Sequence, residues 1–318
     1  MLYLEGMDVL DVRDLRYFLA VAEELNFSRA AERLGMAQPP LSRAIAQLER
    51  RLDVQLFERS TRHVKLTPAG LILRGEARNA LDAVSAAVHR TRRAGLTTPT
   101  LVVTAKPGVA AGLLQQIVRA YTALPGTPHV EIAVSGYREQ ANMLRDGRAD
   151  LALVNSPYDA HGLDTEPLAS EPRVAALPVG HELSGRAALG CHDLHRHPIA
   201  QWPGLSPAEY LYWSGRDRDF PANGSIEPPV DMPVPGPVVN DSAQLLEVVA
   251  LGQAVALIPL SMAEQNPRAD IVYRSVYDAS PYLIDVAWPK GARAQSIALF
   301  VQTAVKLAVE QQMANRAS

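Results

Sequence analysis

One helical segment limits the possible folds of this chain more than any other feature, because its apolar residues form a single stripe. The segment begins at Gln38, and Pro39 or Pro40 falls in its first turn, where a missing N–H is tolerated. Its apolar residues recur at spacings of four, three and four: Leu41, Ile45, Leu48 and Leu52. Residues at this spacing share one helix face, which must pack against other helices. The opposite face points outward and carries Ser42, Arg43, Ala46, Gln47 and Arg50.

Two shorter helical patterns precede this segment and provide its packing partners. The first runs from Asp14 to Leu25, with a stripe made of Leu15, Phe18, Leu19, Ala22 and Leu25. The second is expected to begin at the N-cap Ser28 and to stop at Gly35, because glycine tolerates the positive φ beyond a helix end. Its small apolar face consists of Ala30, Ala31 and Leu34. Together the three segments predict a helix-turn-helix.

A helix-turn-helix places the N-terminal end of its second helix in the major groove of DNA. Gln38 can pair with adenine, Arg43 with guanine or a phosphate, and Ser42 with either. Ser28 and Arg29, at the start of the preceding helix, are further candidate DNA contacts. The alternative is an ordinary three-helix unit that binds no nucleic acid.

The segment Val54–Thr67 predicts a β-hairpin wing, since two short runs of strand-forming residues flank the polar tip SerThrArgHis. A wing that follows a recognition helix commonly contacts phosphates beside the groove. The basic residues expected to do so are Arg59, Arg62 and Lys65.

A long helix is expected after the wing, with Thr67 as its cap, Pro68 at its first position and an end near Arg93. Ala77, Leu81, Val84 and Val88 recur along it at spacings of four, three and four. Such a seam favours a partner helix, so we expect a linker that forms a homodimer. The alternative is a helix packed on its own domain.

The charge of the chain is unevenly distributed. The net charge is −3, yet the stretch from Asn26 to Arg93 holds thirteen Lys and Arg against six Asp and Glu. A compact basic part on an acidic protein is typical of a segment that binds the phosphates of double-stranded DNA. A basic surface without a partner would give the same pattern.

The remaining two thirds alternate strands and helices. Strands are expected at Leu101–Ala105, Val130–Val134 and Asp150–Val154, with helices at Gly112–Leu124 and Glu139–Asp146. Repeated βα units with nearly continuous apolar strands predict a parallel sheet covered by helices. Ligands bind at the carboxyl ends of such strands.

The strand ends give a set of candidate effector-binding residues: Lys106, Pro107, Tyr137, Asn155, Ser156, Trp202 and Ser242. Lys106 precedes an expected helix start, and an ammonium group beside free helix N–H groups favours an anion, so we expect a carboxylate effector. Tyr137 and Trp202 can stack on an aromatic ligand. The alternatives are an exposed surface lysine and two packing aromatics.

Several function classes have no support in the sequence. The motif GCHDLHRHP, residues 190–198, offers Cys191, His192, Asp193, His195 and His197, but a structural zinc site needs a second, distant ligand pair, so we expect an exposed connector and no metal. No motif of a serine hydrolase, zinc protease, P-loop or Rossmann protein occurs, which argues against an enzyme and against a cofactor. Cys191 is the single cysteine, no apolar run is long enough for a membrane helix, and the first ten residues lack a basic signal region; these features favour the cytoplasm. A solute-binding module without DNA remains the rival interpretation.

The run FLAVAEELNFSRAAERLGMAQPPLSRAIAQLERRLDVQLFERSTRHVKLTPAG, within Leu15–Gly70, closely resembles the DNA-binding signature of LysR-type transcriptional regulators. The resemblance implies that Gln38, Pro39, Ser42 and Arg43 lie in the major groove and Arg59 at the wing. It also implies antiparallel dimers through the long helix, tetramers through the effector domains, and RNA polymerase as a further candidate partner.

The same family implies the fold of the whole chain: an N-terminal all-α winged helix-turn-helix (11–67), a linker helix (68–94) and a C-terminal α/β effector domain (97–310). That domain is expected to have two lobes like those of periplasmic binding proteins, one of about 97–160 with 270–310 and the other of about 161–269. The segments RDGRADLALV, LPVGHEL and VVALGQAVALIP carry this weaker part of the resemblance. The chain departs from the family by lacking a second glycine near Ala254 and by a region, Ser206–Pro237, that is unusually rich in proline and aromatic residues. Its prolines between 221 and 237 predict a long irregular loop.

Overall fold

The computed structural model describes residues 10–59, 63–106, 110–218 and 234–317. The chain divides into two compact units, one of residues 1–95 with the short segment Arg145–Gly147, and the other of residues 96–144 and 148–318. Within the described ranges, no helix combines the length and the apolar character that a membrane span requires.

The first unit opens with three helices, α1 (Val12–Glu24), α2 (Phe27–Arg33) and α3 (Gln38–Leu52). Two details of the sequence prediction were wrong. The N-cap of α2 is Asn26 and not Ser28, because the Asn26 side-chain oxygen accepts from the N–H groups of both Ser28 and Arg29. Leu25 lies outside the buried stripe of α1: it is the left-handed C-cap residue and is 46% exposed.

The core of this unit joins all three helices to the first strand. It contains Phe18 from α1, Leu41, Ile45 and Leu48 from α3, and Phe57, all nearly inaccessible to solvent. The predicted apolar stripe of α3 therefore faces inward, and the opposite side of α3 is left for solvent or a partner.

The wing and the long helix follow directly. Strand β1 (Phe57–Arg59) pairs antiparallel with β2 (Val64–Leu66), and α4 (Pro68–Ala94) begins at its N-cap Thr67. The start of α4 packs closely on the wing, since a Cβ added to Gly70 would lie 2.2 Å from the Leu56 carbonyl oxygen. The residues expected at the wing tip, Arg62 among them, lie outside the described residues.

The second unit contains a five-stranded sheet with strand order β4-β3-β5-β13-β6. Its strands are β3 (Thr100–Ala105), β4 (His129–Val134), β5 (Leu151–Asn155), β6 (Leu163–Glu171) and β13 (Tyr282–Pro289). Strands β4 and β5 run parallel to β3, as expected, whereas β13 runs antiparallel to β5 and β6. The helices around it are α5 (Ala111–Thr122), α6 (Glu139–Arg145) and α11 (Gln295–Ala317).

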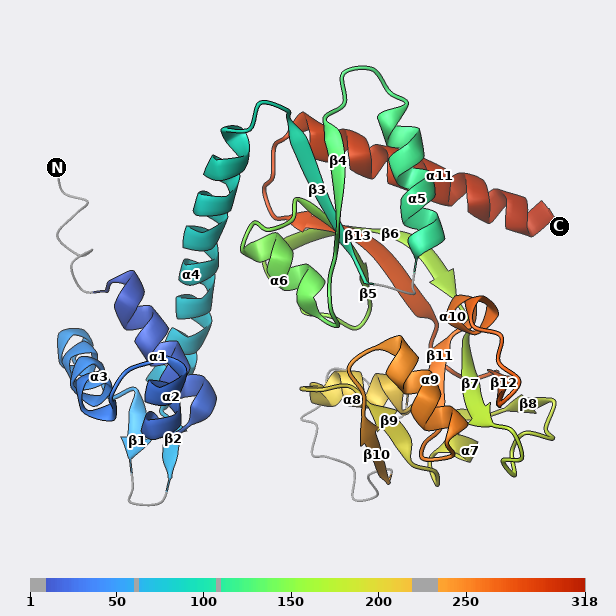
Figure 1. Ribbon diagram of the computed structural model, residues 1–318, viewed down its shortest axis with the longest axis horizontal. Coiled ribbons are helices and arrows are strands. Elements are labelled where there is room, and N and C mark those ends of the chain that lie inside the picture. Colours follow the sequence, from blue (N-terminus) through green and yellow to red (C-terminus); the bar gives the residue numbers. More distant parts are fainter. Residues whose placement is uncertain (1–9, 60–62, 107–109, 219–233, 318) are drawn as a thin grey trace. The chain divides into compact units, whose positions relative to one another are not determined.

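Successive side chains of β3 point to opposite faces of the sheet and therefore belong to two different hydrophobic cores. Val103 packs with residues of α5 and α11, while Val102 packs with residues of α6. The helices thus cover both faces of the sheet, and the strands read as nearly continuous apolar runs for that reason (Figure 1).

A second sheet has strand order β11-β7-β12-β8, beside a two-stranded pair of β9 and β10. These strands are β7 (Arg173–Pro178), β8 (Ala188–Leu189), β9 (Ile199–Gln201), β10 (Pro235–Val238), β11 (Ala256–Pro259) and β12 (Ile271–Val276). The accompanying helices are α7 (Cys191–Leu194), α8 (Pro207–Trp213), α9 (Ser242–Ala250) and α10 (Leu260–Gln265).

The chain crosses between the four-stranded and the five-stranded sheet twice. Both crossings lie at positions that differ from the predicted lobe boundaries. Residues 163–171 form β6 in the first sheet, although we placed them in the second lobe, and 271–276 form β12 in the second sheet, although we placed them in the first. The crossings fall at Pro172 and at 277–281. Strands β6 and β12 join these sheets through pairing with β13 and β7, which lie far away in sequence.

The proline-rich stretch also differs in part from the prediction. Residues 235–238 form the edge strand β10, which runs parallel to β9. Prolines fit here because the flanking residues make the hydrogen bonds: Ile199 N–H donates to Val234 O, and Val239 N–H donates to Gln201 O. The rest of the predicted loop, up to residue 233, lies outside the described residues.

Candidate ligand pocket and DNA interface

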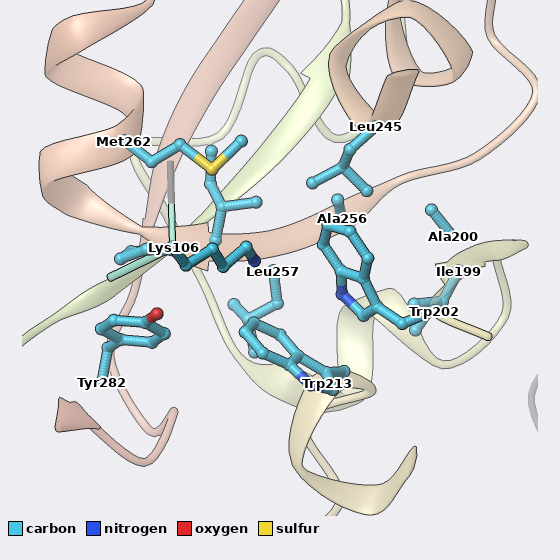
Figure 2. A pocket seen from close by; sticks show the side chains of 12 residues that line it. Lys106, Ile199, Ala200, Trp202, Trp213, Leu245, Ala256, Leu257, Met262 and Tyr282 are labelled. Atoms are coloured by element: carbon cyan, nitrogen blue, oxygen red, sulfur yellow. The ribbon is translucent and has the colours of Figure 1, made fainter. Parts of the chain in front are cut away.

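A narrow hollow that encloses about 20 Å³ lies in the second unit between segments of its sheets. Lys106 is the only charged residue among the described residues of its wall, which Figure 2 shows from close by. The other wall residues are Ile199, Ala200, Trp202, Trp213, Leu245, Ala256, Leu257, Ile258, Pro259, Met262 and Tyr282. An apolar cavity with few polar groups is typical of a small-molecule site.

Lys106 follows β3 and is half-buried against aromatic rings. Its Nζ lies 4.3 Å from the centre of the Trp202 ring and 4.9 Å from that of Tyr137. Burial lowers the pKa of Lys106 to about 8, because an ammonium group loses hydration there. Within the described part of the chain, no carboxylate lies within ion-pair distance of this ammonium group.

Tyr282 begins β13 and is fully inaccessible to solvent. Among the residues that the structure describes, its hydroxyl has no hydrogen-bond partner. Burial raises the pKa of this phenol well above its ordinary value, so the hydroxyl stays protonated and is available as a donor. A buried hydroxyl without a partner is uncommon and indicates a position where a ligand can bind.

An aromatic group encloses Lys106 on one side. The rings of Tyr137 and Trp202 stack with centres 4.5 Å apart, and Trp213 Nε1 donates to the Tyr137 hydroxyl at 3.2 Å. Tyr137 itself is not a wall residue of the hollow. It lies behind Trp202 and fixes the orientation of Trp202 and Trp213, so its packing role is the one with structural support.

Only two of the seven sequence-predicted effector residues, Lys106 and Trp202, line this hollow. Pro107 lies outside the described residues. Asn155 and Ser156, at the end of β5, and Ser242, the first residue of α9, are not among the described wall residues. Asn155 is paired with Ile284 of β13, the added antiparallel strand that the sequence prediction lacked.

Trp213 and Tyr282 are the functional candidates that the sequence prediction missed. Trp213 belongs to the aromatic run Tyr-Leu-Tyr-Trp, residues 210–213, which we noted only as a departure from the family. No local sequence pattern marks Tyr282, because its place in the wall depends on the position of β13 in the sheet.

The segment 190–198 is not the exposed connector that we expected. Residues 191–194 form α7, in which Cys191 and Leu194 are buried. The Cys191 N–H donates to Asp278, and burial and this carboxylate raise the pKa of the thiol to about 12. No metal-binding group of three or more suitable side chains is found among the described residues.

In the first unit, the outer side of α3 carries the predicted DNA contacts. Gln38, Pro39 and Arg43 are exposed and Ser42 is half-buried. Within the residues that the structure describes, Arg43 makes no hydrogen bond or ion pair. Its guanidinium is therefore free to bind a base edge or a phosphate.

Two contacts hold α3 in place while leaving that side open. Arg51, near the end of α3, forms an ion pair with the buried Asp14 of α1. Glu49 accepts the N–H groups of Leu56 and Phe57, so the same helix also fixes the start of the wing. The direction in which the polar side of α3 points is thus set by the core and by these carboxylates.

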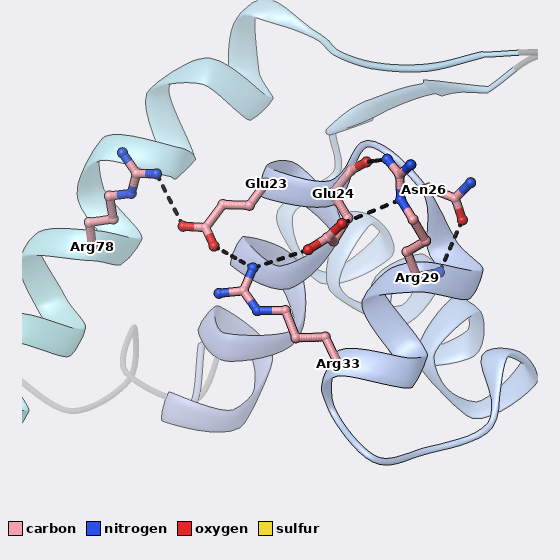
Figure 3. Close-up of polar contacts among 6 residues, drawn as sticks. All are labelled: Glu23, Glu24, Asn26, Arg29, Arg33 and Arg78. Atoms are coloured by element: carbon pink, nitrogen blue, oxygen red, sulfur yellow. Dashed lines mark hydrogen bonds and ion pairs between the residues drawn. The ribbon is translucent and has the colours of Figure 1, made fainter. Parts of the chain in front are cut away.

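The start of α2 is held by a network of arginines and glutamates, shown in Figure 3. Arg29 donates to the Glu24 carbonyl oxygen at 2.6 Å and also pairs with the Glu24 carboxylate. Glu23 pairs with Arg33 at 2.8 Å and with Arg78 of α4 at 3.1 Å. Ser28 is exposed beside this network.

The basic residues of the wing differ in what they contact. Arg59 pairs with Glu49 at 2.9 Å and lies over the Phe27 ring at 4.7 Å, so it ties the wing to α2 and α3. Lys65 is exposed and has no ion-pair partner within the described residues. Of these two residues, Lys65 is therefore the one available to a phosphate.

The seam of α4 is only partly covered. Ala77 is buried and Leu81 is half-buried within the first unit, whereas Val84 is 41% exposed and Val88 43%. Two exposed valines one helical turn apart form an apolar strip typical of a helix that pairs with another.

Comparisons with known proteins match both parts of the chain. Residues 12–71 match the bacterial regulatory helix-turn-helix family of the lysR type, and residues 94–308 match the LysR substrate binding domain. BudR of Raoultella terrigena, an HTH-type transcriptional regulator, is 30% identical over 92% of this chain and 99% of its own length. A probable hydrogen peroxide-inducible genes activator of Mycobacterium xenopi is 40% identical over 54% of this chain and 92% of its own.

The crystal structure of full-length CbnR complexed with its target DNA has 25% sequence identity to this chain and a TM-score of 0.50. The match covers 94% of this chain and 100% of the CbnR chain. The three helices with the wing fall within the first matched segment, and the α/β unit with its pocket falls within the second. The chain belongs to the LysR family of bacterial transcriptional regulators, with a DNA-binding helix-turn-helix and an effector-binding domain.

Proposed function

We propose that α3 reads base edges in the major groove through Gln38, Pro39, Ser42 and Arg43. The observation that carries this proposal is the Arg43 guanidinium, which is exposed on the side of α3 opposite its buried leucines and has no partner within the described residues. An arginine in this position can donate two hydrogen bonds to guanine.

The residues around α3 orient the protein on DNA by contacting the phosphate backbone. Ser28 and Lys65 are exposed and supply phosphate contacts, and Arg62 at the wing tip remains a prediction of the same kind. Arg29 is also exposed, but it must leave Glu24 to bind a phosphate. Arg59 acts on DNA through the position of the wing, because its guanidinium is already paired with Glu49. Phosphate contacts of this type make affinity depend strongly on salt.

Regulation follows from the other two parts of the chain. The exposed valines of α4 support a homodimer through this helix, and we expect tetramers through the effector-binding domains. A carboxylate effector that prefers one arrangement of the two sheets shifts the population toward it. The resulting change in the spacing of the DNA-binding units alters DNA bending or the access of RNA polymerase, without enzymatic chemistry.

Retardation of the DNA upstream of the protein's own gene tests the proposal. Arg43→Ala should lower binding to that DNA by about 1–3 kcal/mol and reduce discrimination against random DNA. Arg293→Ala changes an exposed arginine of the second unit and serves as the control. Lys65→Ala should weaken both DNAs equally and reduce the salt dependence. Unchanged discrimination by a folded Arg43→Ala protein would contradict the role of α3.

A further inference from the structure

The pocket offers one positive charge and one neutral donor in walls that are otherwise apolar. Lys106 supplies the charge, and the Tyr282 hydroxyl supplies the donor. Figure 2 shows both side chains at the same hollow, with the tyrosine oxygen turned toward the lysine side chain. Neither group has a hydrogen bond or an ion pair within the described residues, although Lys106 is half-buried and Tyr282 is fully buried.

The Lys106 ammonium group and the Tyr282 hydroxyl together are complementary to the polar head group of a ligand. A carboxylate has two oxygens that accept hydrogen bonds. It also carries a negative charge, which would pair with the ammonium group of Lys106. Among the contacts of Lys106 within the described residues are the faces of Trp202 and Tyr137, and no carboxylate is one of them. Aromatic faces attract a cation, but they offer less than a carboxylate in the same dry surroundings.

The remaining wall residues determine which chemical character the rest of the ligand can have. Aliphatic and indole side chains such as Leu245, Met262 and Trp213 leave no partner for a second charged group. A second carboxylate would therefore be buried without a counter-ion, which is strongly unfavourable. The wall accordingly selects an apolar body over a charged one, and the hollow must widen to admit it, because its enclosed space is about 20 Å³.

We infer that the effector is a small monocarboxylate with an apolar body, whose carboxylate is bound by the Lys106 ammonium group and the Tyr282 hydroxyl. This inference rests on the proposed function and makes its effector class specific: one carboxylate and not two, and two named side chains of which one was not evident from the sequence.

Isothermal titration of the full chain with matched compounds tests the ligand class. Pentanoate, pentanamide and glutarate share a five-carbon chain and differ only in having one carboxylate, an amide, or two carboxylates; phenylacetate and phenylacetamide form an aromatic pair. We expect at least one of the two monocarboxylates to bind roughly tenfold or more tightly than its amide and than glutarate. Equal or tighter binding of glutarate, or no binding of either monocarboxylate, would overturn the inference.

Variants then test the two residues. Lys106→Met keeps the apolar stem and should abolish the preference for carboxylate over amide, while Tyr282→Phe removes only the hydroxyl and should weaken carboxylate binding by roughly fivefold or more. Lys290→Met and Tyr277→Phe change exposed residues away from the hollow and should bind as the unaltered chain does. Unaltered carboxylate binding by Lys106→Met or Tyr282→Phe would contradict the assignment.

The DNA retardation assay distinguishes failure of the inferred ligand class from failure of the proposed function. If the upstream DNA is bound specifically but neither monocarboxylate binds, the ligand class is wrong and the regulator stands. If no specific DNA binding occurs, the proposed function fails whatever the pocket binds.

Discussion

Lys106 is held in a setting where its charge depends on pH in the range used for experiments. Burial lowers its pKa to about 8, and the titratable groups facing it, Tyr137 and Tyr282, have pKa values raised by their own burial and stay neutral there. In the proposed binding mode, a carboxylate binds to the protonated lysine and raises its pKa. Affinity for pentanoate should therefore be constant below about pH 8 and fall by up to about tenfold per pH unit above it.

Isothermal titration between about pH 6.5 and pH 9.5 measures this dependence. Lys106→Met provides the control, because its residual affinity should not vary across the same range. An affinity that rises with pH, or the same decline in the Lys106→Met protein, would show that another group is responsible.

Cys191 bears on a different mode of sensing. One relative is named as a peroxide-inducible activator, and peroxide chemistry on a protein thiol proceeds through the thiolate. In this chain the single cysteine is buried, and its pKa is raised to about 12 by burial and by Asp278. It has no second cysteine with which to form an internal disulfide. Thiol oxidation is therefore a poor candidate for the signal, and the pocket is the better one.

At the scale of elements, the contact between α4 and the wing depends on one glycine. A Cβ at Gly70 would lie 2.2 Å from the Leu56 carbonyl oxygen and 2.9 Å from Leu66, whereas one at Gly75 of the same helix meets nothing within 4 Å. Gly70→Ala should lower the free energy of unfolding by about 1–3 kcal/mol, since the wing must move. Gly75→Ala should raise it by about 0.5–1 kcal/mol through helix propensity.

Thermal unfolding of the full chain, together with hydrogen exchange of the wing amides, checks both substitutions. Faster exchange confined to the wing in Gly70→Ala is the expected result. Equal stability of the two alanine variants would show that the close approach at Gly70 relaxes without cost.

The elements also show what could be predicted from sequence and what could not. The stripe Leu41, Ile45 and Leu48 determined which side of α3 is buried, because helical periodicity is a local property of the chain. The exchange of β6 and β12 between the sheets could not be predicted, since it depends on pairing with distant strands that have similar apolar patterns. Tyr282 was missed for the same reason: its place in the pocket follows from β13 and not from its neighbours in sequence.

At the scale of the whole molecule, the proposed regulation depends on assembly of two or more chains. A single winged unit contacts one half-site, and two units joined in a dimer bind with a much higher effective concentration at the second half-site. The partly exposed seam of α4 is where the described structure offers such a contact, through Val84 and Val88.

Val84→Asp places a charge on that seam and should shift the protein toward monomers, because burying an unpaired carboxylate between two helices is costly. Asn79→Asp introduces the same residue at an exposed position of α4 that the apolar seam does not include, so it should leave assembly unchanged. Sedimentation velocity measures the oligomeric state, and retardation of two-half-site DNA should weaken by roughly tenfold or more in Val84→Asp alone. Dimers that persist in Val84→Asp would place the dimer contact elsewhere on the chain, and the spacing of the two DNA-binding units would then depend on that other surface.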